Sequence, residues 1–306
     1  MQTDQKIIVV AGPTASGKSD LAMNLAQEFN GELICSDSMQ VYRKMDIGTA
    51  KPTLAEQKLV PYHQLDLIDP DGHYSAGQYE RDTSLIIKQI QERGHLPILV
   101  GGTGLYYRAL MYGISNIPDI PESLREEILG WQTEHGTSYC WNQLQKHDPE
   151  GAARLHPNDT ARILRSLEVV LATGRTLTSF QQQQPFSKAR YEFQAVALEW
   201  ERSRLYERIN QRTRSMLDSG WIAEVEMLLT QYPPKLKPLQ AIGYREIVQY
   251  LHAELEWEPM VQRIQQRTRQ YAKRQMTWFK KEDQVEWYRP DVEASILTQI
   301  KSFLSR

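Results

Sequence analysis

The fold class rests on one segment, Gly12-Pro13-Thr14-Ala15-Ser16-Gly17-Lys18-Ser19. It matches the phosphate-loop pattern G-x-x-x-x-G-K-[ST], in which glycines let successive backbone N–H groups turn toward one anion. A β-branched run at 7–11 precedes it, and a run with helical spacing at 20–29 follows it, which is the context that the motif requires. We therefore predict a phosphate site in which Lys18 supplies positive charge and the Ser19 hydroxyl binds Mg²⁺.

Further hydrophobic runs predict the rest of a sheet. Residues 33–35, 96–100 and 195–198 read as buried strands, and helical spacing at 75–93 lies between two of them. Such alternation indicates a parallel sheet covered on both faces. The predicted fold class is α/β, a P-loop NTPase-like parallel sheet flanked by helices.

The pattern changes near Ile117. Pro118 and Pro121 interrupt the chain, strand-like runs disappear, and helical segments follow up to a polar run at 181–184, which we predict to be a loop. We predict an inserted all-helical domain over 117–193, within a catalytic core made of 1–116 and 194–306. The core is expected to end in helices, at about 203–218, 222–229, 245–251 and 259–281.

Composition is typical of a cytoplasmic globular protein. The 306 residues are 41% hydrophobic and 24% charged, which suits a large core with one insertion. No apolar run approaches the roughly 20 residues of a membrane helix, and the start is short and polar rather than a signal peptide. Cys35 and Cys140 lack metal-ligand spacing, so we expect neither a disulfide framework nor a zinc site. We take the chain to be a monomer without membrane association.

One acidic residue follows the second predicted strand. A hydrolysing NTPase usually presents an Asp to its magnesium at the end of the third strand, where this chain has Gly101-Gly102. Asp37 lies instead at the carboxyl end of the second strand, the edge where open parallel sheets bind ligands. It is a candidate proton acceptor, and a turn-forming Asp is an equally good interpretation.

Positive charge is concentrated near the carboxyl end, although the net charge is only −2. Seven Lys and Arg residues lie between Arg263 and Lys281 without an Asp or Glu, and Tyr271, Trp278 and Phe279 are interleaved. This basic stripe suits phosphate contacts and base stacking in RNA. A solvated helix face with its aromatic residues in the core would give the same pattern.

Several segments closely resemble the tRNA dimethylallyltransferases. They are the phosphate loop, Asp37-Ser38-Met39-Gln40-Val41-Tyr42, Asp46-Ile47-Gly48-Thr49-Ala50-Lys51-Pro52 and Val100-Gly101-Gly102-Thr103-Gly104-Leu105-Tyr106. The resemblance continues through Asn158-Asp159 with Arg162 and Arg165, through 209–220, and through Ala241-Ile242-Gly243-Tyr244-Arg245-Glu246. It covers nearly the whole chain in order, which makes it far more specific than the phosphate loop alone.

The resemblance implies transfer of a dimethylallyl group from dimethylallyl diphosphate to N6 of the adenosine 3' of the anticodon in tRNA. It implies catalytic roles for Asp37 as general base and for Lys18, Thr103 and Arg212, with Mg²⁺ at Ser19. The donor diphosphate would be held by Gly12, Thr14, Ala15, Ser16, Gly17, Lys18 and Ser19. The tRNA anticodon stem-loop would be bound by Asp37, Ser38, Met39, Gln40, Thr103, Arg125, Ala161, Arg162, Ile163, Leu164, Arg165, Gln240, Ala241, Ile242, Gly243, Tyr244, Arg245, Lys273, Arg274 and Trp278.

Three other functions remain open on sequence grounds. A small-molecule kinase would have the same phosphate loop, and a related enzyme could prenylate free adenine nucleotides. A nonenzymatic RNA-binding module would not need a phosphate loop beside an acid. The inserted helical domain and the basic stripe favour a macromolecular acceptor over a free nucleotide.

Overall fold

The computed structural model describes residues 6–115, 117–183 and 188–306. The chain divides into two compact units. The first comprises the described residues up to Met111 together with Ala189–Arg306, and the second is Tyr112–Lys188. No helix in the described ranges is long and apolar enough to cross a membrane.

The first unit contains a six-stranded sheet. Its strands are β1 (Lys6–Ala11), β2 (Gly31–Ser36), β3 (Tyr62–His63), β4 (Leu96–Gly101), β5 (Glu192–Leu198) and β6 (Val285–Tyr288). They lie in the order β3-β2-β4-β1-β5-β6, and every neighbouring pair is parallel. The predicted α/β fold class is confirmed.

Strand β5 begins at Glu192, before the predicted domain boundary at 193/194. Glu192 and Phe193 pair with Lys6 and Ile7 of β1, so they belong to the sheet and not to the helical insertion. At the other boundary, Asn116 lies outside the described residues.

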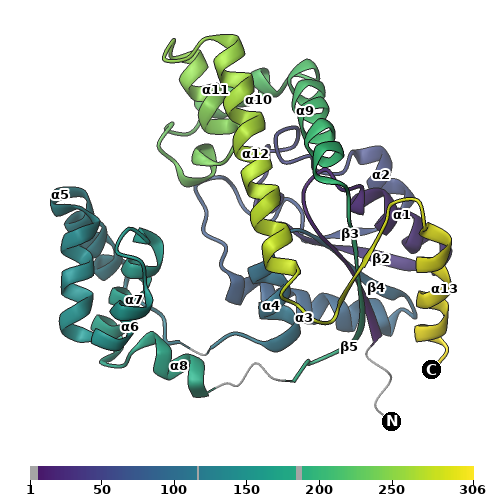
Figure 1. The fold of residues 1–306 in the computed structure, drawn as a ribbon, viewed down its shortest axis with the longest axis horizontal. Coiled ribbons are helices and arrows are strands. Elements are labelled where there is room, and N and C mark those ends of the chain that lie inside the picture. The colour runs from purple at the N-terminus through teal and green to yellow at the C-terminus, as the bar shows by residue number, and fades with distance from the viewer. Residues whose placement is uncertain (1–5, 116, 184–187) are drawn as a thin grey trace. The chain divides into compact units, whose positions relative to one another are not determined.

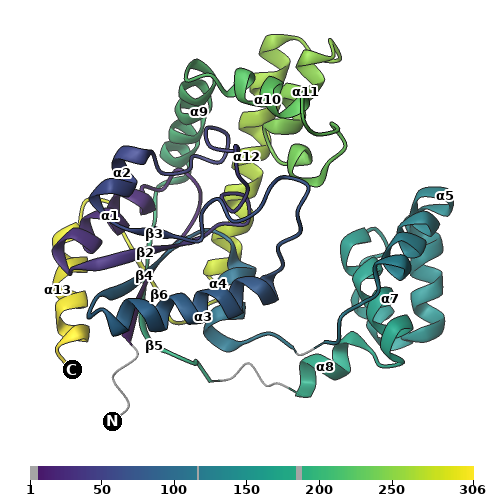
Figure 2. The same ribbon diagram turned by 180° about the vertical axis from the view of Figure 1, so that it is seen from behind.

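Helices cover both faces of the sheet (Figures 1 and 2). On one face, α1 (Lys18–Glu28) and α13 (Glu293–Leu304) pack on the side chains of Ile8 and Val10. The opposite face is covered by α3 (Ala76–Glu92) and α4 (Gly104–Tyr112). There Tyr107 of α4 contacts the ring of Phe193 edge-on. Because side chains alternate along strands, each face of β1 is buried by a different layer.

A helical layer stands beside the carboxyl ends of the strands. It contains α9 (Arg202–Asp218), α10 (Trp221–Leu229), the short η1 (Lys237–Gln240), α11 (Tyr244–Leu251) and α12 (Trp257–Phe279), while α2 (Leu54–Leu59) lies near α1. Its core includes Leu217, Trp221, Ile247 and Ile264. In Figure 1, α12 runs from α10 and α11 to α4. This long helix therefore connects the helical layer to the sheet.

The second unit is helical. It contains α5 (Glu122–His147), α6 (Pro149–Arg154), α7 (Thr160–Thr173) and α8 (Leu177–Gln183). Ile128, Leu144 and Leu167 are fully buried in its core, against which Trp131 and Trp141 pack. The predicted loop at 181–184 is wrong for residues 181–183, which end α8. Gln184 lies outside the described residues.

Candidate active site

The phosphate loop joins β1 to α1 through two glycines with left-handed backbones. Gly12 has φ +127° and Gly17, the N-cap of α1, has φ +91°, a region that side chains disfavour. The first N–H groups of α1 have no intrahelical partner, and they point into the loop with the positive end of the helix dipole. This is the geometry of an anion site.

Lys18 places a charge in this loop. Its Nζ donates to the carbonyl of Pro13 at 3.2 Å. The pKa of Lys18 is lowered to about 8, first by burial and then by the charge of the nearby Arg212, while Asp37 and Cys35 act in the opposite direction. A bound anion would favour the charged form and offset the burial.

Two serines in the loop suit a phosphate and its ion. Ser16 Oγ is buried, and no hydrogen-bond partner for it exists in the described part of the chain. Ser19 is exposed at the start of α1. A cavity of about 430 Å³ opens here, lined by Ala15, Gly17, Lys18, Ser19, Asp20, Ala50, Arg208, Gln211, Arg212 and Ser215. We refer to it as the anion cavity.

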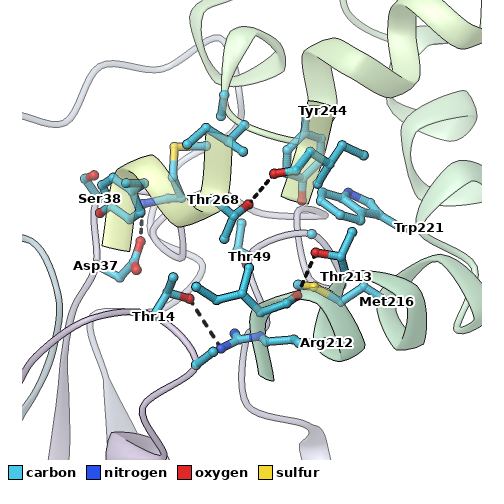
Figure 3. A pocket seen from close by; sticks show the side chains of 18 of the residues that line it. Thr14, Asp37, Ser38, Thr49, Arg212, Thr213, Met216, Trp221, Tyr244 and Thr268 are labelled. Carbon is cyan, nitrogen blue, oxygen red and sulfur yellow. Dashed lines mark hydrogen bonds between the residues drawn. The ribbon is translucent and has the colours of Figure 1, made fainter. Parts of the chain in front are cut away.

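A second cavity of about 370 Å³ adjoins the first (Figure 3). We call it the inner cavity. It shares Ala15 and Arg212 with the anion cavity, and hydrophobic side chains from α9, α10 and α12 form much of its wall. The residues that line it are Thr14, Ala15, Asp37, Ser38, Met39, Gly48, Thr49, Ile209, Arg212, Thr213, Met216, Trp221, Ala241, Ile242, Tyr244, Ile264, Thr268, Tyr271 and Arg274.

Arg212 lies at the boundary of the two cavities. Figure 3 shows it extending from α9 toward Thr14, whose Oγ1 accepts a hydrogen bond from Nη1 at 3.4 Å. Burial lowers the pKa of Arg212, and the carboxylates of Asp37 and Asp20 partly offset this. A cation held this way can stabilise charge that develops on a group passing between the cavities.

Asp37 and Thr103 meet at the ends of two neighbouring strands. Asp37 follows β2 directly, and its Oδ1 accepts the N–H of Met39 at 2.8 Å. Thr103 Oγ1 accepts the N–H of Ser38 at 3.1 Å, and its own N–H donates to the Ser36 carbonyl at 3.1 Å. One oxygen of Asp37 therefore has the turn-forming role, while the side chain also lines the inner cavity.

Three side chains that the sequence reasoning passed over hold the phosphate loop. Trp200 Nε1 donates to the Ser16 carbonyl at 2.8 Å, and Arg208 Nε donates to the Ala15 carbonyl at 2.8 Å. The guanidinium of Arg208 lies 4.5 Å from the Trp200 ring centre. Gln275 accepts the N–H of Thr14 at 2.9 Å, so that this amide is directed at a side chain.

The segment 240–245 borders the inner cavity with only part of its length. Ala241, Ile242 and Tyr244 line it, and the Tyr244 hydroxyl donates to Glu224 Oε1 at 2.7 Å. A side chain at Gly243 would overlap the Trp221 ring, because an added Cβ would lie 1.9 Å from it. Gln240 is exposed, and Arg245 contacts the buried Glu246.

Some residues of the basic stripe on α12 pair with neighbouring helices, and others are exposed. Arg267 pairs with Glu246 at 3.1 Å and Arg269 donates to Asn210 at 2.8 Å, which fastens α12 to α11 and α9. Lys273 and Arg274 are exposed, and Arg274 also lies 5.7 Å from the Tyr271 ring centre.

The aromatic residues of the stripe face the protein. Trp278 packs edge-on against Tyr107 with ring centres 5.8 Å apart, and Phe279 is buried. Burial raises the pKa of Tyr271, with the Asp37 charge adding to the rise, while hydrogen bonding with Thr103 and Gln275 opposes it. Tyr271 lines the inner cavity, whereas Trp278 packs against other aromatic rings.

In the helical unit, the predicted RNA residues differ in exposure. On α7, Ala161 and Arg162 are exposed, Leu164 and Arg165 are half-buried, and Ile163 is fully buried in the core. Arg162, Arg165 and Arg125 pair with acids three residues away in the sequence. The Ile163 side chain faces the domain core rather than solvent.

Comparison with known proteins places this geometry in one family. The IPP transferase family profile matches residues 40–282. The chain is 45% identical to tRNA dimethylallyltransferase 1 of Citrifermentans bemidjiense, over 98% of this chain and 97% of that protein. It is 43% identical to the tRNA dimethylallyltransferase of Geobacter sulfurreducens, over 92% of this chain and 91% of that one.

Solved structures agree with the sequence relatives. The full-length tRNA isopentenylpyrophosphate transferase of Bacillus halodurans superposes with a TM-score of 0.73 at 36% identity, covering 99% of this chain and 97% of that one. A eukaryotic dimethylallyltransferase acting on tRNA gives a TM-score of 0.84 at 31% identity, covering 99% and 80%. The resemblance drawn from the sequence is confirmed, and the chain belongs to the IPP transferase family of the tRNA dimethylallyltransferases.

Proposed function

We propose that the chain transfers a dimethylallyl group from dimethylallyl diphosphate to N6 of the adenosine 3' of the anticodon in tRNA. The names of its relatives support tRNA prenylation. The structural observation that carries the proposal is that the anion cavity and the inner cavity share Arg212, with Asp37 on the wall of the inner one. A charged leaving group, a hydrophobic tail and an attacking base can then meet at one boundary.

The donor would bind with its diphosphate in the anion cavity. A five-carbon tail contributes only about 4 kcal/mol when buried, at roughly 0.8 kcal/mol per CH₂, so the diphosphate must be the main anchor. The donors suited to it are Lys18, the amides of the first turn of α1 and the Ser16 hydroxyl, which has no hydrogen-bond partner among the residues that the structure describes. The prenyl tail would extend past Arg212 into the inner cavity.

The residues present fit a magnesium ion brought by the substrate. Mg²⁺ prefers oxygen ligands, keeps several waters and is usually held by one or two side chains plus phosphate oxygens. Within the described residues no three His, Cys, Asp or Glu side chains are grouped to hold a metal, whereas Ser19 offers a hydroxyl at the anion cavity. When bound there, the ion would neutralise charge on the departing diphosphate.

In the proposed transfer one bond forms as another breaks, and the residues of the site accept the charge and the proton that result. The N6 lone pair of adenine forms a bond to C1 of the prenyl group as the bond from C1 to the diphosphate oxygen breaks. Negative charge grows on the diphosphate, where Lys18 and Arg212 would meet it. The N6 proton would pass to Asp37, an effect typically worth about 10²–10⁴-fold in rate.

The acceptor base must leave its stack to reach the inner cavity. Thr103, hydrogen-bonded to Ser38 beside Asp37, would help to seat the nucleotide. The exposed Gln240 and Lys273 of the first unit and the exposed Arg162 of the second are suited to contact RNA outside the cavity. Arg274, which is exposed and also lines the inner cavity, is suited to contact RNA where the target nucleotide enters. We take the enzyme to act as a cytoplasmic monomer.

An assay with labelled dimethylallyl diphosphate tests this function. Each reaction would contain the protein, Mg²⁺ and one possible acceptor. The four acceptors are an unmodified anticodon stem-loop, the same stem-loop with guanosine replacing the target adenosine, AMP and ATP. We expect label only in the adenosine stem-loop. Label in AMP but not RNA would favour the nucleotide prenyltransferase, and rapid γ-phosphate transfer from ATP would favour the kinase.

A further inference from the structure

A buried amide lies between the ends of the two central strands. β1 and β4 are neighbours whose chain connections leave in opposite directions along the sheet, toward β2 and β5. Such a switch point is where open parallel sheets bind ligands. Gln275 of α12 reaches this point with only 6% of its surface exposed.

Both functional groups of Gln275 are used there. Oε1 accepts the N–H of Thr14, in the phosphate loop after β1, at 2.9 Å. Nε2 donates to the carbonyl of Gly102, after β4, at 2.9 Å. A Cβ added to Gly102 would lie 2.1 Å from Nε2, so the absence of a side chain at this position makes room for the amide. Gln275 of α12 thus connects the loop after β1 to the loop after β4.

The three segments that meet at Gln275 are the phosphate loop, the loop at Gly102 and α12. Each carries residues with a different role in the proposed reaction. Thr14 precedes the loop residues suited to the diphosphate and accepts a bond from Arg212. Gly102 precedes Thr103, which holds Ser38 beside Asp37. On α12 itself, Lys273 and Arg274 are exposed next to Gln275 in the sequence. The Gln275 amide therefore joins the phosphate loop and the loop before Thr103 to the helix that carries Lys273 and Arg274.

We infer that Gln275 is a positioning residue that couples tRNA binding to donor binding, an inference that rests on the proposed function. RNA contacts that hold α12 would hold the Gln275 amide and, through it, the Thr14 backbone in the conformation that receives the diphosphate. By thermodynamic linkage, the donor must then tighten RNA binding by the same factor.

Binding measurements on variants test the coupling. Gln275→Glu keeps the acceptor for Thr14 but places a carboxylate oxygen against the Gly102 carbonyl, and Gln275→Met removes both hydrogen bonds without adding charge. Gly102→Ala disturbs the same contact from the strand side. Gln262→Glu, at an exposed position on the same helix, is the matched control.

Affinity for dimethylallyl diphosphate would be measured by calorimetry with and without the guanosine-substituted stem-loop, which has no N6 amine to alkylate. Single-turnover rates with the adenosine stem-loop and thermal unfolding would be measured beside it. For the wild type and Gln262→Glu, we expect the stem-loop to tighten donor binding at least about fivefold, the lower range of typical coupling. In Gln275→Glu, Gln275→Met and Gly102→Ala, this factor should approach one. Stem-loop affinity measured without donor should stay within about twofold.

Loss of the coupling factor in folded variants that still bind each ligand would support the inference. Equal affinities with and without the stem-loop in the wild type would overturn it, as would variants that couple like the wild type. Either result is distinct from failure of the proposed function, in which the wild type would bind no donor or leave the stem-loop unlabelled.

Discussion

Nη1 of Arg212 lies 3.4 Å from Oγ1 of Thr14, so a guanidinium from α9 touches the phosphate loop at the boundary of the two cavities. We predict that Arg212→Met lowers the single-turnover rate by about 10²–10³-fold, because charge on the departing diphosphate would lose one stabilising donor. Rapid-quench measurements with saturating donor and stem-loop would test this.

Arg214→Met is the control for that change, since Arg214 is exposed on the same helix and lies outside both cavities. It should leave the rate within about twofold of the wild type. A matching loss in both variants would assign the effect to helix charge in general.

Lys18 should make donor binding depend on pH in the alkaline range. Its pKa of about 8 means that the ligand-free side chain is charged below pH 8 and loses its charge above it. The affinity for dimethylallyl diphosphate should therefore fall by up to about tenfold between pH 7.5 and pH 9. In the Lys18→Arg variant the side chain stays charged over this range. The diphosphate ionises in the same way with both proteins, so the variant should not show the loss of affinity that comes from Lys18. Parallel pH profiles in the two proteins would contradict the prediction.

The same residue should lower the stability of the ligand-free enzyme. Because folding lowers the pKa of Lys18, the folded state binds fewer protons, and the charged form costs stability below pH 8. We expect Lys18→Met to raise the free energy of unfolding by about 1–3 kcal/mol at pH 7. The difference from the wild type should shrink as the pH rises from 8 toward 10.5. Denaturant titrations across this range would measure it, with added pyrophosphate stabilising the wild type more than Lys18→Met.

The strands with continuous hydrophobic runs could be predicted from the sequence, and the two short strands could not. The strands β1, β2, β4 and β5 are largely buried on both faces, so their hydrophobic residues form continuous runs in the sequence. By contrast, β3 has two residues and β6 has four, and neither contains a comparable run. The helix α13 had a detectable signal in the spacing of Ile296, Ile300 and Phe303, which the sequence reasoning did not use.

The site was predictable where a motif or a charge marked it. The phosphate loop, Asp37 and Arg212 do line the two adjoining cavities. Gln275 and Trp200 gave no such signal, because a neutral amide and an indole have no characteristic spacing. The bond of Gln275 to Thr14 joins residues 261 positions apart, so it depends on where α12 packs. Burial likewise decided which residue of the α7 segment faces the core.

The two neighbours Arg162 and Ile163 on α7 should behave in opposite ways. Ile163→Ala removes a fully buried side chain and should lower the stability of the helical unit by about 2–5 kcal/mol. Arg162→Ala should change stability by less than about 0.5 kcal/mol but weaken stem-loop binding and reduce its salt dependence. Thermal unfolding and binding at several salt concentrations, below the melting temperature of the Ile163 variant, separate the two effects. Unchanged RNA binding in the Arg162 variant would exclude Arg162 from the proposed RNA interface.

Asp37→Asn separates the two roles that the sequence left open for this residue. An Asn Oδ1 can accept the N–H of Met39 as the carboxylate does at 2.8 Å, so the turn should persist. The amide cannot take up the N6 proton, and we expect the single-turnover rate to fall by about 10²–10⁴-fold. Stem-loop and donor affinities should stay within about threefold, since neither the turn nor the anion cavity changes. Asp37→Ala, which also loses the turn, should in addition weaken stem-loop binding. If Asp37→Asn transfers at the wild-type rate while Asp37→Ala does not, the side chain acts only by shaping the turn, and the proton must leave by another route.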